Sequence, residues 1–431
     1  MALNPSSTPP VRLVVADDPR RSRLTVFFRL LLAVPHFAWL ALWSVATLVV
    51  VVINWFATLF RGQSPGWAHR FLAAYLRYST HLNAFLALAA DPFPGFTGAP
   101  GSYPVDVEID PPARQNRWKT GFRGLLVPPA ALLAGAVGGS SLSVSTGGFS
   151  FSLGVSLLFA AALLGWWVGL FRARMPAGLE HAATYGLGYS AQLSAYSMLL
   201  TDRYPNSDPL LVPGPGPAPE HPVALRALDD GQRNRLTVFF RGLLAIPHIV
   251  WIYLWYLLAG LFALAQWFVI MFTGRPHPGI HRLIASFLRY QTMVSAYLLL
   301  LADPYPPFVP AETKTYPVDL DPIAPAAAQN RWKTFFRLPL ALPASLLSSS
   351  YGLALLLVAV FTWWTVLFTG RMPTGLRRLG LASARYSVHL SAYVLLLTDR
   401  YPYSGPTLEG VDEPRGAPEP LLRPGAEPAA P

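Results

Sequence analysis

The sequence predicts an all-α membrane protein with eight transmembrane helices in four hairpin repeats, with interfacial amphipathic helices and short β-strands on one face. Composition is the first reason, because 53% of the residues are hydrophobic, 13% are charged and the mean hydropathy is +0.37, values typical of membrane proteins. The second reason is a run of residues that ends in Asp-x-aromatic-Pro and occurs four times. The third reason is that each interval between these endings contains a long stretch without charge.

The repeated ending marks the C-terminus of a helix. Its copies span residues 77–94, 188–205, 289–306 and 385–402, and each passes through a fully apolar turn before it reaches the proline. Proline cannot continue a helix, and the residue before it is pushed toward extended backbone. Each copy therefore closes one repeat unit. We predict units at 11–97, 103–206, 222–308 and 316–404, a Pro/Gly linker at 207–221, and disordered ends at 1–10 and 405–431.

The first unit is expected to open with a short strand at 11–15 and an interfacial helix. The apolar segment 24–34 carries Arg29 and then His36 at helical spacing, so a narrow polar stripe follows one side. The segment is too short to cross a hydrocarbon core of about 30 Å, and Pro35 is expected to bend or break it. We therefore place it in the headgroup region.

The first transmembrane hairpin follows. Residues 37–60 contain no charge, and tryptophans lie near both ends of this segment, as in aromatic belts. A tight turn is expected at 61–66, and the returning helix at 67–90 ends in the repeated motif. The unit therefore crosses the membrane twice.

The second unit follows the same plan with an insertion. A clearly alternating strand at 103–110 precedes an interfacial segment that begins at 115–123. A Gly/Ser-rich stretch at 138–150 then separates this segment from a span at 151–171, and 179–200 returns. The insertion indicates that the interfacial segment and the span are two elements rather than one kinked helix.

The second half of the chain repeats the first. Residues 235–241 match 23–29 letter for letter, and 329–334 match 115–120. Units one and three are therefore of one type and units two and four of another, as a duplicated pair would give. The spans expected in the second half are 249–272, 280–301, 351–368 and 376–397.

Several motifs of the third unit resemble a known bacterial family. They are Ile246-Pro247-His248, Phe272-Thr273-Gly274-Arg275, Leu288-Arg289-Tyr290, Ala296-Tyr297, and the stretch from Asp303 to Pro306-Pro307-Phe308. Together they resemble domain of unknown function 4389 (DUF4389), a family of uncharacterised integral membrane proteins, over nearly the whole of residues 11–405. Unit two departs most from the pattern, with Gly188 in place of arginine and Pro128-Pro129 in place of Pro-His. The resemblance implies a membrane fold and no particular activity.

Five polar residues lie within the expected returning helices. They are Arg77, His81, Arg289, Arg385 and His389. Arg385, His389 and Tyr393 are spaced by four residues and share one helix face. Charge at membrane depth is costly and points by default to function. The alternative is a structural role, which we favour about two to one over a functional one. In this interpretation the apolar part of each arginine side chain extends along the helix, so that the guanidinium reaches the interface.

Cofactor sites and catalytic sites have little support. The chain has no cysteine, which excludes disulfides, thiolate metal sites and thiol catalysis. His36 and His248 follow a helix-breaking proline in the odd units, but haem ligation would need a facing partner. His277 and His281 are four residues apart without a nearby carboxylate, which is weak for zinc. We expect no cofactor, no metal and no enzyme activity.

Arginine and aspartate recur at matching positions of every unit. The arginines lie in the interfacial segments, and the aspartates end the returning helices. An aspartate at a helix C-terminus is disfavoured by the helix dipole unless it is paired. We therefore predict four ion pairs at the membrane surface, formed by Arg29, Arg123, Arg241 and Arg337 with Asp91, Asp202, Asp303 and Asp399.

The expected function is that of a non-catalytic membrane scaffold or partner-binding protein. The alternative is a transporter or channel with a path between the pseudo-symmetric halves. The net charge of +11 is expected to meet anionic lipid headgroups at the basic interfacial helices, and no nucleic acid. The location expected is the bacterial plasma membrane. Because Arg20, Arg21 and Arg23 precede the first span, both termini are predicted to be cytoplasmic, with all hairpin turns on the opposite side.

Overall fold

The computed structural model describes residues 9–16, 18–139, 143–146, 149–152, 155–212, 214–228, 231–309, 316–408 and 411–412. These residues form 13 α-helices, one 3₁₀ helix at Pro209–Leu211 and seven short strands, and helix accounts for 63%. The chain is therefore mostly helical, as predicted. The disorder expected at 1–10 and 405–431 falls largely outside the described residues.

Units one and three have the same three helices. The short helices are α1 (Arg23–Leu32) and α8 (Arg235–Leu244), the long ones are α2 (Val34–Arg61) and α9 (Ile246–Thr273), and the returning ones are α3 (Gly66–Leu86) and α10 (Pro278–Leu298). The side chains of Ser22 and Asn234 cap the short helices. Pro35 and Pro247 lie in the first turn of the long helices, where proline is tolerated. Proline thus starts α2 and α9, and the short helix before each remains a separate element.

Units two and four divide their helices differently. Unit two has α4 (Arg117–Gly121), α5 (Arg123–Val137), α6 (Leu157–Arg172) and α7 (Ala177–Ser197). Unit four has α11 (Arg331–Phe335), α12 (Arg337–Thr369) and α13 (Thr374–Val394). The expectation of a separate interfacial segment and span is wrong for unit four, because α12 joins both in one 33-residue helix that includes Pro343. Without the insertion of unit two, nothing interrupts the helix.

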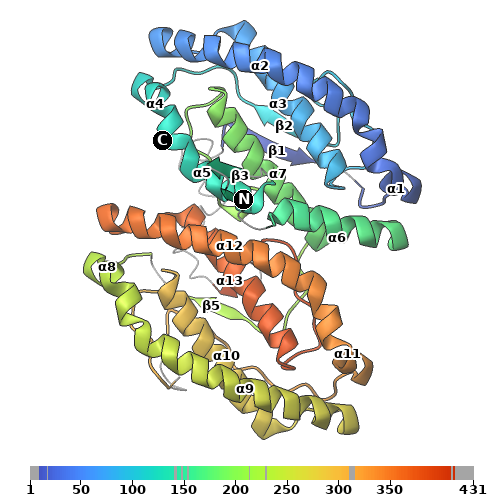
Figure 1. Ribbon diagram of the computed structural model, residues 1–431, viewed down its shortest axis with the longest axis vertical. Helices are drawn as coiled ribbons and strands as arrows, with labels where there is room; N and C mark the ends of the chain where they lie inside the picture. Colours follow the sequence, from blue (N-terminus) through green and yellow to red (C-terminus); the bar gives the residue numbers. More distant parts are fainter. Residues whose placement is uncertain are drawn as a thin grey trace, which may run out of the picture.

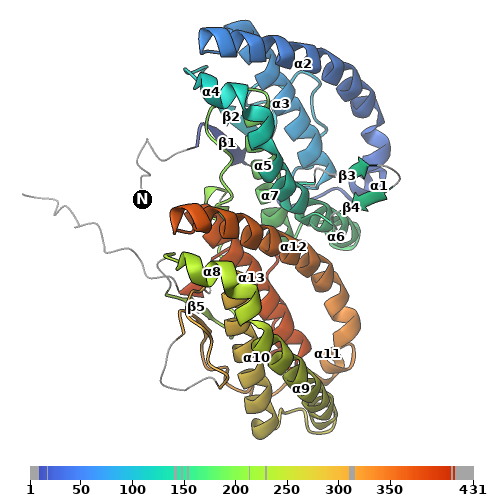
Figure 2. The ribbon, with the colours of Figure 1, turned by 60° about the vertical axis from the view of Figure 1, so that its left-hand side comes forward.

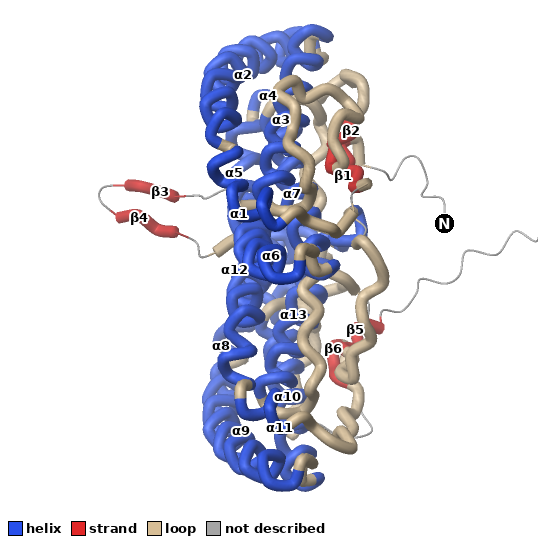
Figure 3. Tube along the Cα trace, turned by 90° about the vertical axis from the view of Figure 1, so that its right-hand side faces the viewer, coloured by secondary structure: helices blue, strands red, loops and turns tan. Residues whose placement is uncertain are grey.

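The strands form two small sheets on one face and a hairpin on the other. β1 (Val11–Val15) pairs antiparallel with β2 (Val105–Ile109). β5 (Leu225–Ala227) pairs antiparallel with β6 (Val318–Leu320) and parallel with β7 (Val411–Asp412). β3 (Ser143–Thr146) and β4 (Phe149–Ser152) form a hairpin that projects from the helical side in Figure 3.

The molecule is a slab of three layers. Figure 3 shows the long helices α2, α12 and α9 on one side, the returning helices α3, α7, α13 and α10 in the middle, and the sheets with most loops on the other side. Figure 1 looks down the shortest axis, and the long helices run across this view rather than along it. Figure 2 shows the two halves of the chain stacked, and they meet where α5 and α6 contact α12. The buried core lies mainly around the middle layer.

Each hairpin turn contacts the start of a neighbouring unit. Arg21 N donates to Ala173 O at 2.9 Å, Gln115 N to Gly62 O at 2.8 Å, Arg233 N to Gly370 O at 3.0 Å, and Gln329 N to Gly274 O at 2.9 Å. The sequence predicts these turns on the opposite side of the membrane from the segments that they contact here. That expected separation is wrong, because neighbouring units run antiparallel within the slab, so the turn of one meets the start of the next.

Candidate functional site

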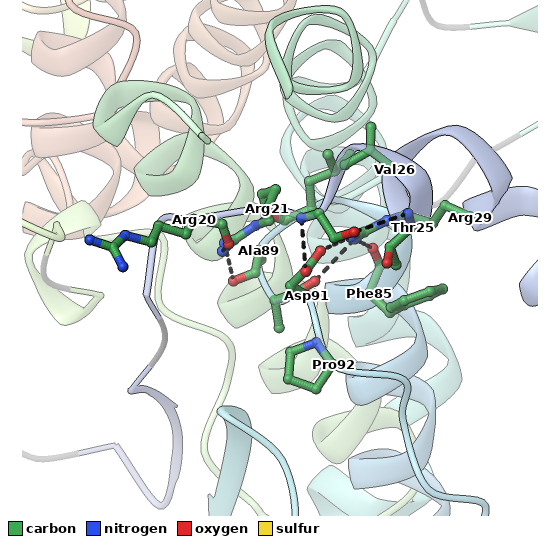
Figure 4. A network of polar contacts seen from close by, with 12 residues as sticks. Arg20, Arg21, Thr25, Val26, Arg29, Phe85, Ala89, Asp91 and Pro92 are labelled. Atoms are coloured by element: carbon green, nitrogen blue, oxygen red, sulfur yellow. Dashed lines mark hydrogen bonds and ion pairs between the residues drawn. The ribbon is translucent and has the colours of Figure 1, made fainter. Parts of the chain in front are cut away.

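Each short helix sends a buried arginine to the end of a returning helix. In unit one, Arg29 is 2% exposed, and its Nη2 donates to Asp91 Oδ1 at 2.7 Å. Its Nη1 donates to the carbonyls of Phe85 and Ala90, and its guanidinium lies 4.4 Å from the centre of the Phe85 ring (Figure 4). Burial lowers the pKa of Arg29 to about 10, and the Asp91 carboxylate opposes this change, so the side chain stays charged. The arrangement satisfies carbonyls that a helix end leaves without intrahelical partners.

The same arginine clamp occurs in all four units. The pairs join Arg123 to Asp202 at 3.3 Å, Arg241 to Asp303 at 2.6 Å, and Arg337 to Asp399 at 2.5 Å. The arginines of these pairs also lie over aromatic rings, at 4.3, 4.5 and 4.5 Å from the ring centres. The structure therefore brings together every arginine–aspartate pair that the sequence predicts, and each acts as the anchor of a helix end.

A second donor, not expected from the sequence, binds the same helix ends. A leucine with positive φ lies two residues after the last residue of each returning helix, and the carbonyl of that leucine accepts from a side chain in the segment before the short helix. Odd units use arginine and even units use glutamine, in the pairs Arg21–Leu88, Arg233–Leu300, Gln115–Leu199 and Gln329–Leu396. The signal was present in the sequence, since both glutamines begin the repeated Gln-Asn-Arg-Trp-Lys-Thr motif.

Three of the five polar residues of the returning helices hold the strand layer. Arg77 Nε donates to Val107 O at 3.1 Å, and Arg289 forms two bonds with the Asp319 carboxylate at 2.7 and 2.6 Å. His81 Nε2 lies 2.8 Å from Asp106 Oδ1. Burial would raise the pKa of Asp106, but the hydrogen bonds from His81 and from two backbone amides lower it overall. These contacts favour the structural interpretation, because the polar groups face the sheets.

The other two predicted residues, Arg385 and His389, line one cavity. Arg385 donates to the carbonyls of Thr407 at 3.1 Å and Gly405 at 2.8 Å, and its Nη1 lies 3.4 Å from His389 Nδ1. The His389 ring stacks on His221 with 3.6 Å between ring centres. These side chains, with Arg400, line a cavity of about 450 Å³.

The two histidines of this cavity are neutral at pH 7. Burial, together with the charge of Arg385, lowers the pKa of His221 to about 4 and that of His389 to about 2. Tyr393, expected on the same helix face as Arg385 and His389, instead lies under Arg337. His221 was not predicted, because no sequence signal links the linker to the last helix.

The histidines that follow proline pack against aromatic rings. His36 Nδ1 lies 2.9 Å from the Tyr78 hydroxyl, and its ring stacks on Phe96 at 4.2 Å. His248 has the same surroundings, with Tyr290 at 2.6 Å and Phe308 at 4.3 Å. In the described part of the chain, no group of three histidine, aspartate or glutamate side chains could hold a metal ion. The described surroundings of His36 and His248 thus consist of aromatic contacts.

The long helices bury polar side chains and expose apolar ones. The buried residues of α2 are His36, Thr47, Asn54 and Thr58, whereas Leu42, Val45 and Leu48 are each about two-thirds exposed. Helices of soluble proteins show the reverse pattern, and apolar patches of this size mark contact with lipid or protein. Within the residues described, α2, α9 and α12 are long and apolar enough to cross a membrane. The chain is therefore a membrane protein by composition and by exposed surface.

Exposed basic residues gather where each turn meets its neighbouring unit. Arg23 Nη2 donates to Phe171 O and Arg331 Nη2 to Phe272 O, both at 3.0 Å. Arg20 and Arg174 form an isolated β-bridge, as do Gln63 and Arg114. The exposed basic residues form four groups, one at each hairpin turn, which we call the rim clusters. They contain Arg20, Arg23, Arg172 and Arg174; Arg61, Arg114, Arg117 and Lys119; Arg275, Arg331 and Lys333; and Arg235 and Arg371.

Comparison with known proteins identifies the family of this chain. Residues 23–97, 235–309 and 331–404 each match the model of a family described as a domain of unknown function, DUF4389, and together they cover more than half of the chain. No curated protein and no solved structure shows a significant match. The family model leaves unit two unmatched, although this unit retains the clamp between Arg123 and Asp202.

Proposed function

The chain belongs to the DUF4389 family, and we propose that it is a non-catalytic membrane scaffold whose helical slab lies within one leaflet of the bacterial plasma membrane. In this proposal the long helices lie roughly parallel to the membrane surface. The rim clusters contact anionic headgroups, and the strand layer faces the cytoplasm, where it offers a surface for partners.

The carrying observation is the contact between hairpin turns and the starts of neighbouring units. A turn and a short helix joined by backbone hydrogen bonds lie at the same depth, as at Ala173 and Arg21. With eight crossings they would lie on opposite sides of a core of about 30 Å. A helix parallel to the membrane needs no such separation, and its apolar surface is equally well solvated by lipid.

The strand layer gives independent support. If the slab stood upright, with its long helices crossing the bilayer, the sheets would lie at the depth of the lipid tails. β1 and β2 form a sheet with open edges, and Arg12, Glu108 and Asp110 form exposed ion pairs on it. Open sheet edges and exposed charges do not occur in contact with the hydrocarbon core. With the slab flat on the leaflet, the same groups face water.

The rim clusters fit the flat orientation as well. They lie at the ends of the long helices, with exposed arginine and lysine heads beside exposed apolar residues such as Trp118 and Trp332. Basic residues near an anionic leaflet contribute about 1 kcal/mol each, and tryptophan prefers the headgroup level. The transporter alternative lacks comparable support, because a path through the bilayer requires crossing helices.

Single-cysteine labelling tests this proposal directly, because the chain has no cysteine of its own. Glu108→Cys places a thiol on the strand layer, Arg275→Cys on a hairpin turn and Arg20→Cys before the first short helix. A membrane-impermeant maleimide should label all three in inverted membrane vesicles and none in intact spheroplasts. Val49→Cys, on the outer surface of α2, should resist the reagent in both preparations.

The eight-span arrangement gives a different pattern. It places Arg275 across the membrane from Glu108 and Arg20, so the turn would be labelled in the preparation in which the other two are protected. That result would overturn the flat orientation. Labelling of all three only in spheroplasts would retain the orientation in one leaflet but contradict the cytoplasmic placement.

A further inference from the structure

A large cavity, which we call the seam cavity, lies between the two halves of the chain. It has a volume of about 710 Å³ and is lined by α5 and the loop after α7 from the first half, and by α12 and the start of α13 from the second. The seam is visible in Figure 1 between α5 and α12. Ligand pockets have volumes of about 300–1,000 Å³ and occur preferentially at domain interfaces. An occupant of the seam cavity would therefore contact both halves.

The apolar part of the seam cavity continues into the exposed surface of the long helices. Leu133 of α5 and Val360, Phe361 and Trp364 of α12 form this part. Val360 and Trp364 are 43% and 55% exposed. Figure 3 shows α12 on the side of the slab that carries the long helices, where apolar side chains are exposed. An apolar occupant can therefore enter this part of the cavity from the hydrocarbon that covers the long helices.

The polar part of the seam cavity lies toward the strand layer and contains two donors without partners. Asn206 and Ser207 line it, and Asn206 also borders a small cavity beside Val11 of β1. The side-chain oxygen of Asn206 accepts from the backbone amide of Asp208 at 3.0 Å, which leaves the amide nitrogen for another contact. In the described part of the chain, neither this nitrogen nor the hydroxyl of Ser207, a residue only 5% exposed, has a hydrogen-bond partner. Buried donors normally have one, so the occupant should offer an acceptor oxygen.

An aromatic ring occupies the equivalent place in the other half of the pseudo-symmetric pair. Tyr403 corresponds to Asn206, because each follows the aspartate of its arginine clamp by four residues. A Cβ on Gly178 would lie 3.1 Å from the Tyr403 ring, whereas a Cβ on the equivalent Gly375 would meet the side-chain oxygen of Asn206. Asparagine in place of tyrosine thus removes a ring from the wall of the seam cavity. Tyrosine at position 206 is therefore a substitution that the repeat already accommodates.

We propose that the seam cavity binds a glycerophospholipid of the membrane. At least one acyl chain lies in the apolar part, and an ester carbonyl accepts from Asn206 and Ser207. The direction from the apolar to the polar part matches that of a lipid in the cytoplasmic leaflet, with its chains toward the bilayer centre and its ester groups toward water. The inference rests on the proposed function only for this direction, because binding itself can be measured in detergent. The bound lipid joins the two halves of the chain, since both line the cavity.

Photolabelling of the purified full chain in mild detergent tests the proposal. The probe is a phosphatidylcholine with a diazirine in the middle of one acyl chain, and the labelled peptides are quantified by mass spectrometry. We expect adducts concentrated at residues 129–133 and 360–365. Val360→Trp and Asn206→Tyr, which fill the cavity by different routes, should each lower this labelling by about fivefold or more, the equivalent of about 1 kcal/mol. Leu163→Trp, at the equivalent outer position of α6 and 39% exposed, is the matched control and should leave it unchanged.

A second comparison tests the ester contact. The ether-linked form of the probe lacks the ester carbonyls, so it should label the parent about fivefold less, as loss of one or two hydrogen bonds predicts. In the double variant Asn206→Ala with Ser207→Ala, the ester and ether probes should label equally, because no donor remains to distinguish them. A variant that only disturbed the packing would still distinguish the two probes.

Three results would overturn the proposal. Labelling spread evenly over all exposed apolar helices, or unchanged in both filling variants, would show that the cavity is not the site. Equal labelling of the parent by the ester and ether probes would refute the ester contact. Unlabelled phosphatidylglycerol and phosphatidylcholine should compete equally, because they share the ester groups, and competition by only one of them would refute recognition through those groups. These outcomes do not depend on how the slab is oriented in the membrane, so they are distinguishable from failure of the proposed function.

Discussion

Removal of one carboxylate should show that the arginine clamps anchor the helix ends. Arg241 is 2% exposed, and its guanidinium donates to Asp303 at 2.6 Å and to the carbonyls of Tyr297 and Ala302 at 2.8 and 2.9 Å. Asp303→Ala deletes the only acidic partner that this arginine has among the described residues. The guanidinium would then remain buried with a charge that no carboxylate balances.

The expected cost follows from the burial of the pair. Loss of one partner of a buried ion pair costs about 3–5 kcal/mol. Asp303 is 26% exposed, so solvent screens part of the interaction, and we expect about 2–3 kcal/mol. The matched control is Glu108→Ala, which breaks the pair with Arg12 at 3.2 Å, where the side chains are 36% and 58% exposed. An exposed pair of this kind contributes less than about 1 kcal/mol.

Thermal unfolding in mild detergent measures the difference. A domain of 150–250 residues loses about 2–4 °C in Tm per kcal/mol, so Asp303→Ala should lower the midpoint by about 4–12 °C. Glu108→Ala should lower it by less than about 4 °C. Equal midpoints for the two variants would refute the argument, because they would show that burial adds nothing to the pair.

Three further predictions concern other features. Leu300 is buried at φ +65°, a conformation that costs a non-glycine residue about 1–2 kcal/mol, so Leu300→Gly should unfold at a higher temperature than Leu300→Ala, although both fall below the parent. The folded-state pKa of His221 is about 4, below the ordinary value, so stability is lost as pH falls from about 6.5 toward 4. Between pH 7 and pH 5, the free energy of unfolding should decrease in the parent by on the order of 1 kcal/mol more than in His221→Phe. The decrease in Tm should therefore be smaller in the variant. Trp363 donates to Val238 O at 3.1 Å and ties α12 to α8, so Trp363→Phe should cost about 1 kcal/mol, whereas Trp332→Phe, at a 75% exposed position, should leave Tm unchanged in detergent. Equal effects within either pair of variants, or equal pH dependence of His221→Phe and the parent, would contradict these expectations.

Contacts fixed by the repeat were predictable from the sequence. Arg29 and Asp91 are 62 residues apart, as are Arg241 and Asp303 and also Arg337 and Asp399. A constant spacing of opposite charges predicts pairing, because the same local path brings the two groups together in each unit. The insertion of unit two lengthens this spacing to 79 residues between Arg123 and Asp202 without breaking the pair.

Contacts between units could not be predicted in this way. The stacking of His221 on His389 and the bonds from the turns to neighbouring units join segments that share no motif. The partners of Arg77 and Arg289 could not be predicted for the same reason. Their position within apolar helices is visible in the sequence, but the strands that they bind lie 30 residues farther along the chain.

The sequence by itself determined that the chain prefers a membrane, that it consists of four related units, and which charges meet within a unit. Only the tertiary structure decided which helix ends lie beside one another. Hydropathy records how strongly a helix surface prefers lipid to water. This preference is nearly the same for a helix that crosses the bilayer and for a helix that lies within one leaflet. Direction depends on which helix ends are neighbours, as Gly62 and Gln115 are in this fold, and such contacts arise only when the units pack together.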